Sequence, residues 1–201
     1  DIFISNLKVK TYIENSPAVI AVLAQEPRIL NFTPRYIKGS TIEADYKLQH
    51  KDTEKPNIAP ASVVGIDPIA EDKVTGLSKY VIEGSYLAPN DYDQVLIGSF
   101  LLKKYLPIET AAFATLENVE PGTKIRLTIN DVSREVTVKG IVKTKTDEIS
   151  LRVFMVDSQL RGLIGRNDYN VNEIAIKLKT GVDPVAVREA LKAQGVGQVA
   201  R

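Results

Sequence analysis

The chain has 201 residues, of which 44% are hydrophobic and 25% charged, with 26 basic side chains against 25 acidic ones. These values are ordinary for a folded globular protein, and the balanced charge argues against a nucleic-acid-binding protein. The absence of cysteine excludes disulfides and thiolate metal sites. The sequence shows neither a run of about 20 apolar residues nor a signal peptide. Because it begins at Asp1, we expect it to be an excised piece of a longer protein.

The first third of the sequence predicts a strand–helix–strand unit. Ser16 is predicted to cap a helix that Pro17 begins and Pro27 ends. Pro34 and Gly39 are predicted to break the following extended region into separate segments. In chain order the expected elements are a strand, a helix, extended segments, an exposed polar loop and a strand, at 1–5, 16–26, 28–48, 49–60 and 61–67.

The rest of the chain alternates strands with short helices. A hairpin is expected over 123–144, with its turn at Asn130 and Asp131. A helix after the Asp183–Pro184 step, closed by Gly195, is the clearest helical signal. The other expected elements are a short helix after Pro68, a strand and amphipathic helix at 95–107, a strand at 151–157, a helix at 158–166, a strand at 171–179 and a last strand at 196–200.

This order predicts an α+β fold. Strand–helix–strand units at both ends of the chain flank a β-rich middle. The arrangement favours one subdomain built from both chain ends, with a smaller β-rich subdomain inserted in it.

The sequence predicts no catalytic, cofactor-binding or metal-binding residues. His50 is the only histidine and lies in the polar loop, so a zinc site would need carboxylates alone. The acidic segment 90–94 is interpreted as a polar turn before a strand. No nucleophile or phosphate-binding motif occurs, and the glycines of 162–166 close a helix rather than open one. We therefore expect a protein that is not an enzyme.

The phrase Gly–aliphatic–Asp–Pro–aliphatic–Ala occurs at 65–70 and again at 181–186. We interpret Asp67 and Asp183 as helix caps, because a carboxylate followed by proline suits the first turn of a helix. The residues beyond the two phrases do not match, so the repeat does not indicate duplication.

Four stretches together resemble a known family. They are "VVGIDP" (63–68), "YVIEGSYLAPNDYDQVLIGSFLLKKYL" (80–106), "PGTKIRLTI…REVTVKGIV" (121–142) and "FMVDSQLRGLIG…VNEIAIKLKTGVDPVAVREAL" (154–191). Their order resembles the MacB-like periplasmic core domain of FtsX-type ABC transporter permeases, nearest to the lipoprotein-releasing permeases.

The resemblance implies a porter-like subdomain at 1–82 and 164–201 and an inserted, β-rich, Sabre-like subdomain at 83–163. It implies a parent permease in the cell membrane, with one membrane helix before this domain and three after it. The domain would then lie on the extracytoplasmic side, periplasmic or extracellular. The implied partners are a permease dimer mate, a separate cytoplasmic ATPase subunit, and a lipoprotein, peptide or protein substrate. No cofactor and no nucleic acid are implied.

Two further expectations concern motion and contact. Hinges are predicted where the chain crosses between subdomains, at 76–84 and 162–168. Ala111, Ala112 and Phe113 are apolar residues in a polar linker. They are candidates for a partner contact, although packing against the β-rich subdomain is the favoured interpretation.

Three classes of function remain open at the level of sequence. The preferred one is a transporter domain that couples cytoplasmic ATP hydrolysis to substrate movement by mechanical transmission. The second is an FtsX-like regulatory domain that binds and activates a cell-wall hydrolase. The third is a free-standing extracytoplasmic binding protein.

Overall fold

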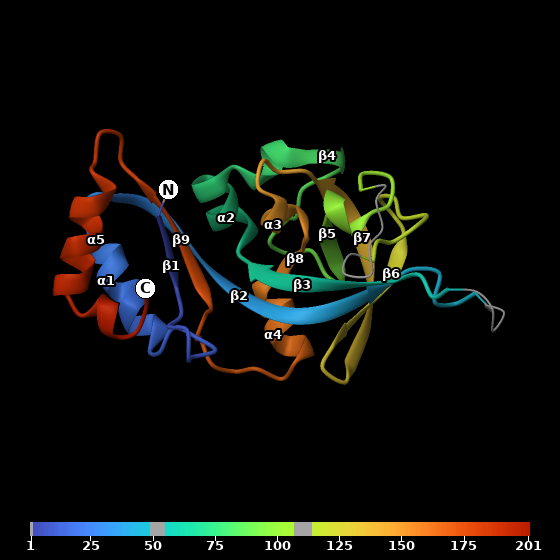
Figure 1. Cartoon of the computed structure of the whole chain (residues 1–201), viewed down its shortest axis with the longest axis horizontal. Coiled ribbons are helices and arrows are strands. Elements are labelled where there is room, and N and C mark those ends of the chain that lie inside the picture. Colours follow the sequence, from blue (N-terminus) through green and yellow to red (C-terminus); the bar gives the residue numbers. More distant parts are fainter. Residues whose placement is uncertain (1, 49–54, 107–113) are drawn as a thin grey trace. The chain divides into compact units, whose positions relative to one another are not determined.

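A computed structural model describes residues 2–48, 55–106 and 114–201 (Figure 1). The chain forms two compact units, which are described separately below. Unit 1 comprises residues 1–37, 66–76 and 167–201, and unit 2 comprises residues 38–65 and 77–166. Both ends of the chain therefore belong to unit 1.

These bounds differ from the predicted ones, because residues 38–65, 77–82 and 164–166 group with unit 2. The chain passes between the units at 37/38, 65/66, 76/77 and 166/167. The last two passages fall within the predicted hinges, whereas the first two lie inside β-strands, where composition gives no signal. The porter-like and Sabre-like assignments stay predictions.

Unit 1 is an antiparallel sheet with strand order β1-β9-β2 and helices packed against it. Because strand residues alternate between faces, Ile174 and Ile176 of β9 join an apolar cluster that also includes Val19, Leu23 and Leu191 of the helices. The intervening β9 residues, beginning with Glu173, lie on the opposite face. The elements are β1 (Ile2–Ser5), α1 (Ser16–Gln25), the first part of β2 (Ile29–Glu43), α2 (Pro68–Thr75), β9 (Glu173–Leu178) and α5 (Pro184–Ala193).

The predicted capping role of Ser16 is wrong. Asn15 occupies the N-cap position in a left-handed conformation, and its side chain makes no capping hydrogen bond. The buried Ser16 hydroxyl instead donates to the Ile13 carbonyl at 2.6 Å and accepts from the Val171 N–H at 3.0 Å. It therefore ties the start of α1 to a chain segment 155 residues away.

β2 is a single strand, so the predicted breaks at Pro34 and Gly39 are wrong. Pairing with β9 continues on both sides of Pro34, as Thr33 lies opposite Ala175 and Arg35 opposite Glu173. One missing donor does not end the ladder when its neighbours remain paired. Gly39 keeps an extended conformation with open space around it.

Unit 2 is built on a closed ring of strands. Its order is β2-β3-β8-β5-β7, and β6 pairs with both β7 and β2 to close the ring, with β4 added outside β7. Closure removes the exposed edges that an open sheet would leave. The remaining elements are β3 (Ile58–Ile66), β4 (Val81–Gly84), β5 (Gln94–Gly98), β6 (Lys124–Ile129), β7 (Val132–Val142), α3 (Asp147–Ser150), β8 (Arg152–Val156) and α4 (Asp157–Leu163).

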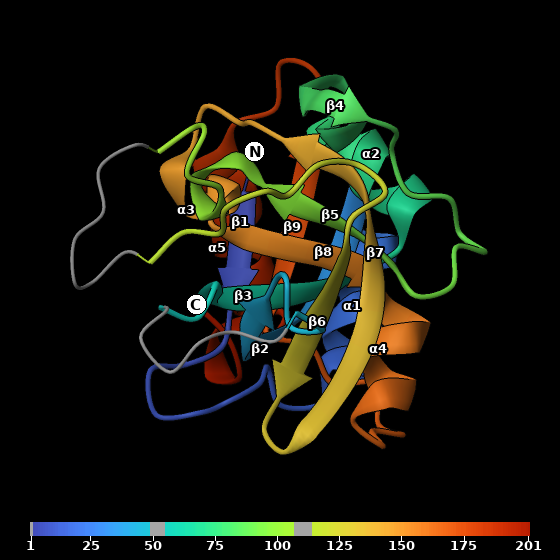
Figure 2. The same cartoon turned by 90° about the vertical axis from the view of Figure 1, so that its right-hand side faces the viewer.

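The longest hairpin of unit 2 is β6–β7, seen from a second direction in Figure 2. Its turn follows the prediction, since Asn130 adopts a φ of 52° between the paired residues Ile129 and Val132. Elsewhere the unit is packed closely enough to require glycine. A Cβ at Gly98 would lie 2.2 Å from the Ser150 carbonyl oxygen.

Two predicted elements are wrong. The predicted amphipathic helix after Gly98 is limited to a 3-10 turn at Ser99–Leu101. It ends there because Leu102 pairs with Leu116 and the Lys103 N–H donates to the Leu116 carbonyl. In place of the predicted strand at 196–200 there is a 3-10 turn at Val196–Gln198, and Ala200 alone forms a β-bridge, with Asn6. A helical turn lets Val196 and Ala200, four residues apart, enter the same apolar cluster.

The Asp–Pro steps are helix caps, as predicted. Asp67 accepts from the N–H groups of Ile69 and Ala70 at 2.9 and 3.1 Å, and Asp183 accepts from Val185 at 3.0 Å. Each aspartate therefore satisfies backbone donors that its helix leaves unpaired.

We expect Asp67→Ala and Asp183→Ala each to lower the free energy of unfolding by about 1 kcal/mol, because each removes a side-chain acceptor at an N-cap. Asp→Asn at the same positions keeps an acceptor oxygen and is the matched control. Urea unfolding measures the change. An equal loss in the Ala and Asn variants at either site would contradict the capping role.

Candidate functional site

The predicted partner contact cannot be placed, because Ala111, Ala112 and Phe113 lie outside the described residues, as does His50. Within the described residues no group of three or more His, Asp or Glu side chains is arranged to hold a metal ion. The acidic segment 90–94 is engaged in ion pairs: Asp91 with Lys139 at 2.5 Å and Asp93 with Arg134 at 2.9 Å. Polar side chains gather at two places in the described structure, a buried ionic cluster in unit 1 and a pocket in unit 2.

The first is a buried ionic cluster in unit 1, centred on Arg35. The Arg35 side chain is 2% exposed and that of Glu71 1%. The guanidinium donates to both Glu71 carboxylate oxygens, from Nε at 2.9 Å and Nη2 at 2.6 Å, and from Nη1 to Glu173 at 2.5 Å. The Phe3 ring covers it, with its centroid 5.6 Å from the Arg35 Cζ.

Each member of the cluster is positioned by a different chain segment. Arg35 lies on β2 directly opposite Glu173 on β9, on the sheet face away from α1 and α5. Glu71 comes from α2 and also accepts from the Thr75 hydroxyl at 2.9 Å. The cluster therefore fastens α2 to the sheet of unit 1.

The electrostatics of the cluster favour charged Arg35. Burial by itself would lower the pKa of Arg35, but hydrogen bonds and charge attraction from Glu71, with Glu173 adding to them, raise the pKa above its usual value. A bidentate pair supplies two charge-assisted hydrogen bonds in one fixed geometry. We interpret the cluster as structural, because Arg35 and Glu71 are almost fully buried and pair with each other through two hydrogen bonds.

We expect Arg35→Met to lower the free energy of unfolding by about 3–5 kcal/mol, because it leaves Glu71 buried without a counter-charge. Arg188→Met is the matched control. Arg188 pairs with Glu189 at the surface, where such pairs contribute little.

Urea unfolding of both variants and of Arg35→Met/Glu71→Leu measures the effect. The double variant is expected to recover part of the loss, since it removes the unpaired charge. A loss in Arg35→Met no larger than in Arg188→Met would contradict the account.

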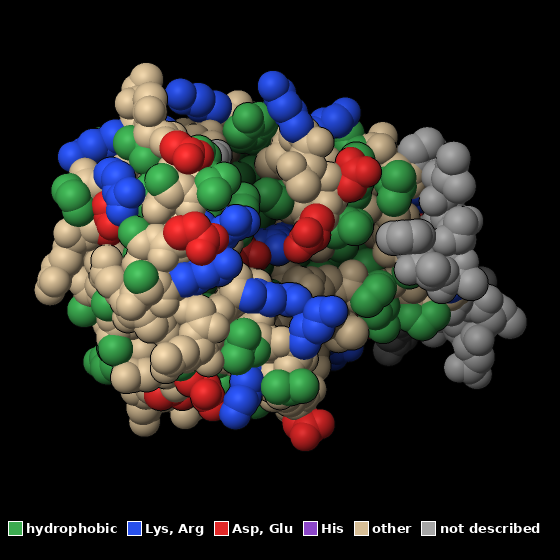
Figure 3. Space-filling model, turned by 60° about the vertical axis from the view of Figure 1, so that its left-hand side comes forward, with side chains coloured by type: hydrophobic (Ala, Val, Ile, Leu, Met, Phe, Trp, Pro, Cys, Tyr) green, Lys and Arg blue, Asp and Glu red, His purple; other side chains and the backbone are tan. Residues whose placement is uncertain are grey.

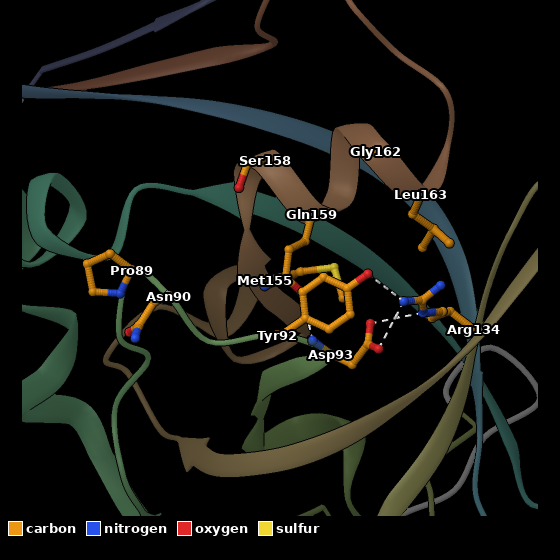
Figure 4. A pocket seen from close by; sticks show the side chains of 10 residues that line it. All are labelled: Pro89, Asn90, Tyr92, Asp93, Arg134, Met155, Ser158, Gln159, Gly162 and Leu163. Atoms are coloured by element: carbon orange, nitrogen blue, oxygen red, sulfur yellow. Dashed lines mark hydrogen bonds and ion pairs between the residues drawn. The ribbon is translucent and has the colours of Figure 1, made fainter.

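The second feature is a pocket of about 510 Å³ in unit 2 (Figure 4). It is formed by the loop before β5, the start of β7, the end of β8 and one side of α4. Its lining residues are Pro89, Asn90, Tyr92, Asp93, Arg134, Met155, Ser158, Gln159, Gly162 and Leu163.

An ion pair forms one side of the pocket. Arg134 donates to both Asp93 oxygens at 2.9 and 3.0 Å and to the Tyr92 hydroxyl at 2.9 Å. The hydrogen bond that Arg134 donates to Asp93, followed by the one that it donates to Tyr92, raises the pKa of Arg134 above its usual value. The Asp93 N–H donates to Gln159 Oε1 at 2.7 Å, which links the loop to α4.

Two hydroxyl groups line the pocket, those of Tyr92 and Ser158. The Tyr92 hydroxyl accepts from Arg134, and no hydrogen bond joins the Ser158 side chain to another described residue. One part of the pocket, the polar segment 90–94, was recognisable in the sequence as a turn. The α4 side was not, because its place in the pocket depends on tertiary pairing.

Acidic and basic side chains are interspersed on the face shown in Figure 3, in keeping with a formal net charge of +1. Among residues 2–48, 55–106 and 114–201, no helix combines the length and apolar composition needed to cross a membrane.

Solved structures share this fold. The periplasmic region of MacB from Actinobacillus actinomycetemcomitans matches with a TM-score of 0.59 and 17% identity over 96% of this chain and 80% of that chain. The extracellular domain of the noncanonic ABC-type transporter YknZ from Gram-positive bacteria matches with a TM-score of 0.59 and 13% identity, over 100% of this chain and 97% of that chain. A permease-protein domain from Porphyromonas gingivalis matches with a TM-score of 0.51 and 16% identity, over 87% of this chain and 68% of that chain. No curated protein sequence matches the chain.

The fold is thus that of the periplasmic or extracellular domains of ABC-type transporters. The chain belongs to the family of the MacB-like periplasmic core domain, whose family model matches residues 6–194. The resemblance noted in the sequence and the predicted mixed α and β fold are confirmed.

Proposed function

We propose that this domain couples ATP hydrolysis on the cytoplasmic side of a membrane to the movement of a substrate on the other side, by mechanical transmission. The domain itself makes and breaks no bonds. Its substrate is a lipoprotein, a peptide or another protein. Its partners are a second permease and a separate ATPase subunit. The family match over residues 6–194 carries the proposal.

The placement of the chain ends supports a domain held by membrane segments. The Ser5 N–H donates to the Arg201 carbonyl and the Arg201 N–H donates to the Ser5 carbonyl, each at 2.9 Å. Figure 1 shows both ends on unit 1. Segments attached at the two ends would therefore emerge side by side, and a displacement of them would act on unit 1 directly.

The packing of unit 1 supports a rigid transmitting element. A lever must resist deformation, and close-packed interiors transmit strain because they compress little. The apolar cluster fixes α1 and α5 on one face of the sheet, and the Arg35 cluster fixes α2 on the other. Helices are thus held against both faces of the unit 1 sheet.

The pairing of the chain ends also provides a direct test. We expect replacement of residues 6–200 by a short Gly/Ser linker, in the full-length permease, to leave assembly with the ATPase intact, because the flanking positions are already adjacent. ATP hydrolysis should persist, while substrate movement should fall to background. Reconstitution in vesicles measures both activities.

The outcomes separate the candidate functions. Transport at the normal rate after the replacement would contradict the proposal. Loss of activation of a cell-wall hydrolase, with no transported substrate, would indicate the FtsX-like regulatory function. A full-length protein without hydrophobic segments of about 20 residues beside this domain would indicate a free-standing binding protein.

A further inference from the structure

We infer that the pocket of unit 2 binds an extended, uncharged segment of polypeptide that carries one apolar side chain. This goes beyond mechanical transmission, which does not require a pocket. The inference rests on three properties of the lining: its charges are mutually satisfied, several of its hydrogen-bonding groups are unpartnered, and its floor is apolar.

The charges in the pocket neutralise each other. Asp93 and Arg134 form a bidentate pair, and the Arg134 Cζ lies 5.5 Å from the centroid of the Tyr92 ring. Each of these two charges already has its counter-ion, so a charged ligand gains less from either of them than it would from an unpaired group. The pocket therefore favours a neutral ligand.

Three side chains offer neutral hydrogen bonds. Asn90 and Ser158 have no hydrogen-bond partner among the described residues. Gln159 accepts from the Asp93 N–H, which fixes its oxygen toward the loop and leaves its two Nε2 hydrogens unpartnered. Two carboxamides and a hydroxyl can both donate and accept, as the alternating N–H and C=O groups of an extended peptide require.

The pocket also has a place for an apolar side chain. Met155, 1% exposed, lies at its base, and Pro89 and Leu163 line its sides. Figure 4 shows Pro89 and Asn90 at one end and Arg134 and Leu163 at the other, with Tyr92, Gln159 and Met155 between them. Methionine adapts its shape to different apolar groups. The volume of about 510 Å³ lies within the range of ligand pockets.

A sugar is the closest competing ligand, since it also forms neutral hydrogen bonds. The structure favours a peptide for two reasons. Tyr92 is the one aromatic residue of the lining, and its hydroxyl is held by Arg134. The floor is formed by aliphatic and thioether groups rather than by a stacking ring.

The test is titration of the isotopically labelled 201-residue chain with capped peptides, followed by amide NMR shifts. The first probe is acetyl-alanyl-leucyl-alanine amide, and its matched control has glycine in place of leucine. We expect millimolar binding of the leucine peptide, with amide shifts in 90–93 and 157–163, and binding about tenfold weaker for the glycine peptide. Maltose is the third probe and should cause no shifts there.

Two variants locate the binding. Gly162→Trp should abolish the shifts, because the position lines the pocket and a Cβ there meets no atom within 4 Å, which leaves room for the ring to enter the pocket. Gly39→Trp is its matched control. It lies in unit 2 outside the pocket with equally open surroundings, and it should bind as the unaltered chain does.

A double variant removes hydrogen-bonding groups from the pocket without filling it. Asn90→Ala/Ser158→Ala deletes groups without hydrogen-bond partners among the described residues, so thermal melting should not change, while peptide affinity should fall several-fold. The inference would be overturned if the leucine peptide caused no shifts at 10 mM, a concentration about tenfold above the expected dissociation constant. Equal shifts in Gly162→Trp and in the unaltered chain would also overturn it. Shifts caused by maltose and not by the peptide would identify a sugar site instead.

Discussion

The buried guanidinium of Arg35 is the group on which the organisation of unit 1 depends. It joins a strand from the first part of the chain, a helix from the middle and a strand from the last part, through Arg35, Glu71 and Glu173. Charges are costly to bury, so each partner stabilises the folded state only while the others are in place. The cluster thus makes three distant chain segments interdependent. It adds to the burial of Pro68 and Val74 in keeping α2 attached to the sheet.

Unit 2 uses a different constraint, the closure of its strands into a ring through β6. Closure positions the start of β7 and the end of β8 and so determines where the pocket can form. The polar groups of the pocket are then fixed by two local bonds, the Asp93–Arg134 pair and the Asp93–Gln159 hydrogen bond. In one unit a polar network is sealed inside the protein, and in the other a comparable network lines an open pocket.

Local sequence signals predicted local structure well. Asp67 and Asp183 cap helices, and Asn130 turns a hairpin, because the responsible interactions span only a few residues. The predictions failed where distant contacts overrode local preference. Pro34 does not end β2, because β9 pairs on both sides of it, and Ser16 bonds to Val171 rather than capping its own helix.

The candidate sites were the least predictable features for the same reason. Arg35 and Glu173 are 138 residues apart, and nothing in their local sequence indicates that they pair. The polar segment 90–94 was visible as a turn, but its partners on β7 and α4 are supplied by the fold. The family was nevertheless recognisable from the sequence, because it shows in four short motifs in a fixed order and not in any single tertiary contact.

The most direct measurement of the central claim is amide hydrogen exchange of α2 in the unaltered chain and in Arg35→Met. If the cluster fastens α2 to unit 1, the α2 amides, including the Gly76 N–H bonded to the Asp72 carbonyl, should exchange about a hundredfold faster in the variant. The β6–β7 amides of unit 2 should keep their protection. Unchanged exchange in α2 would contradict the account.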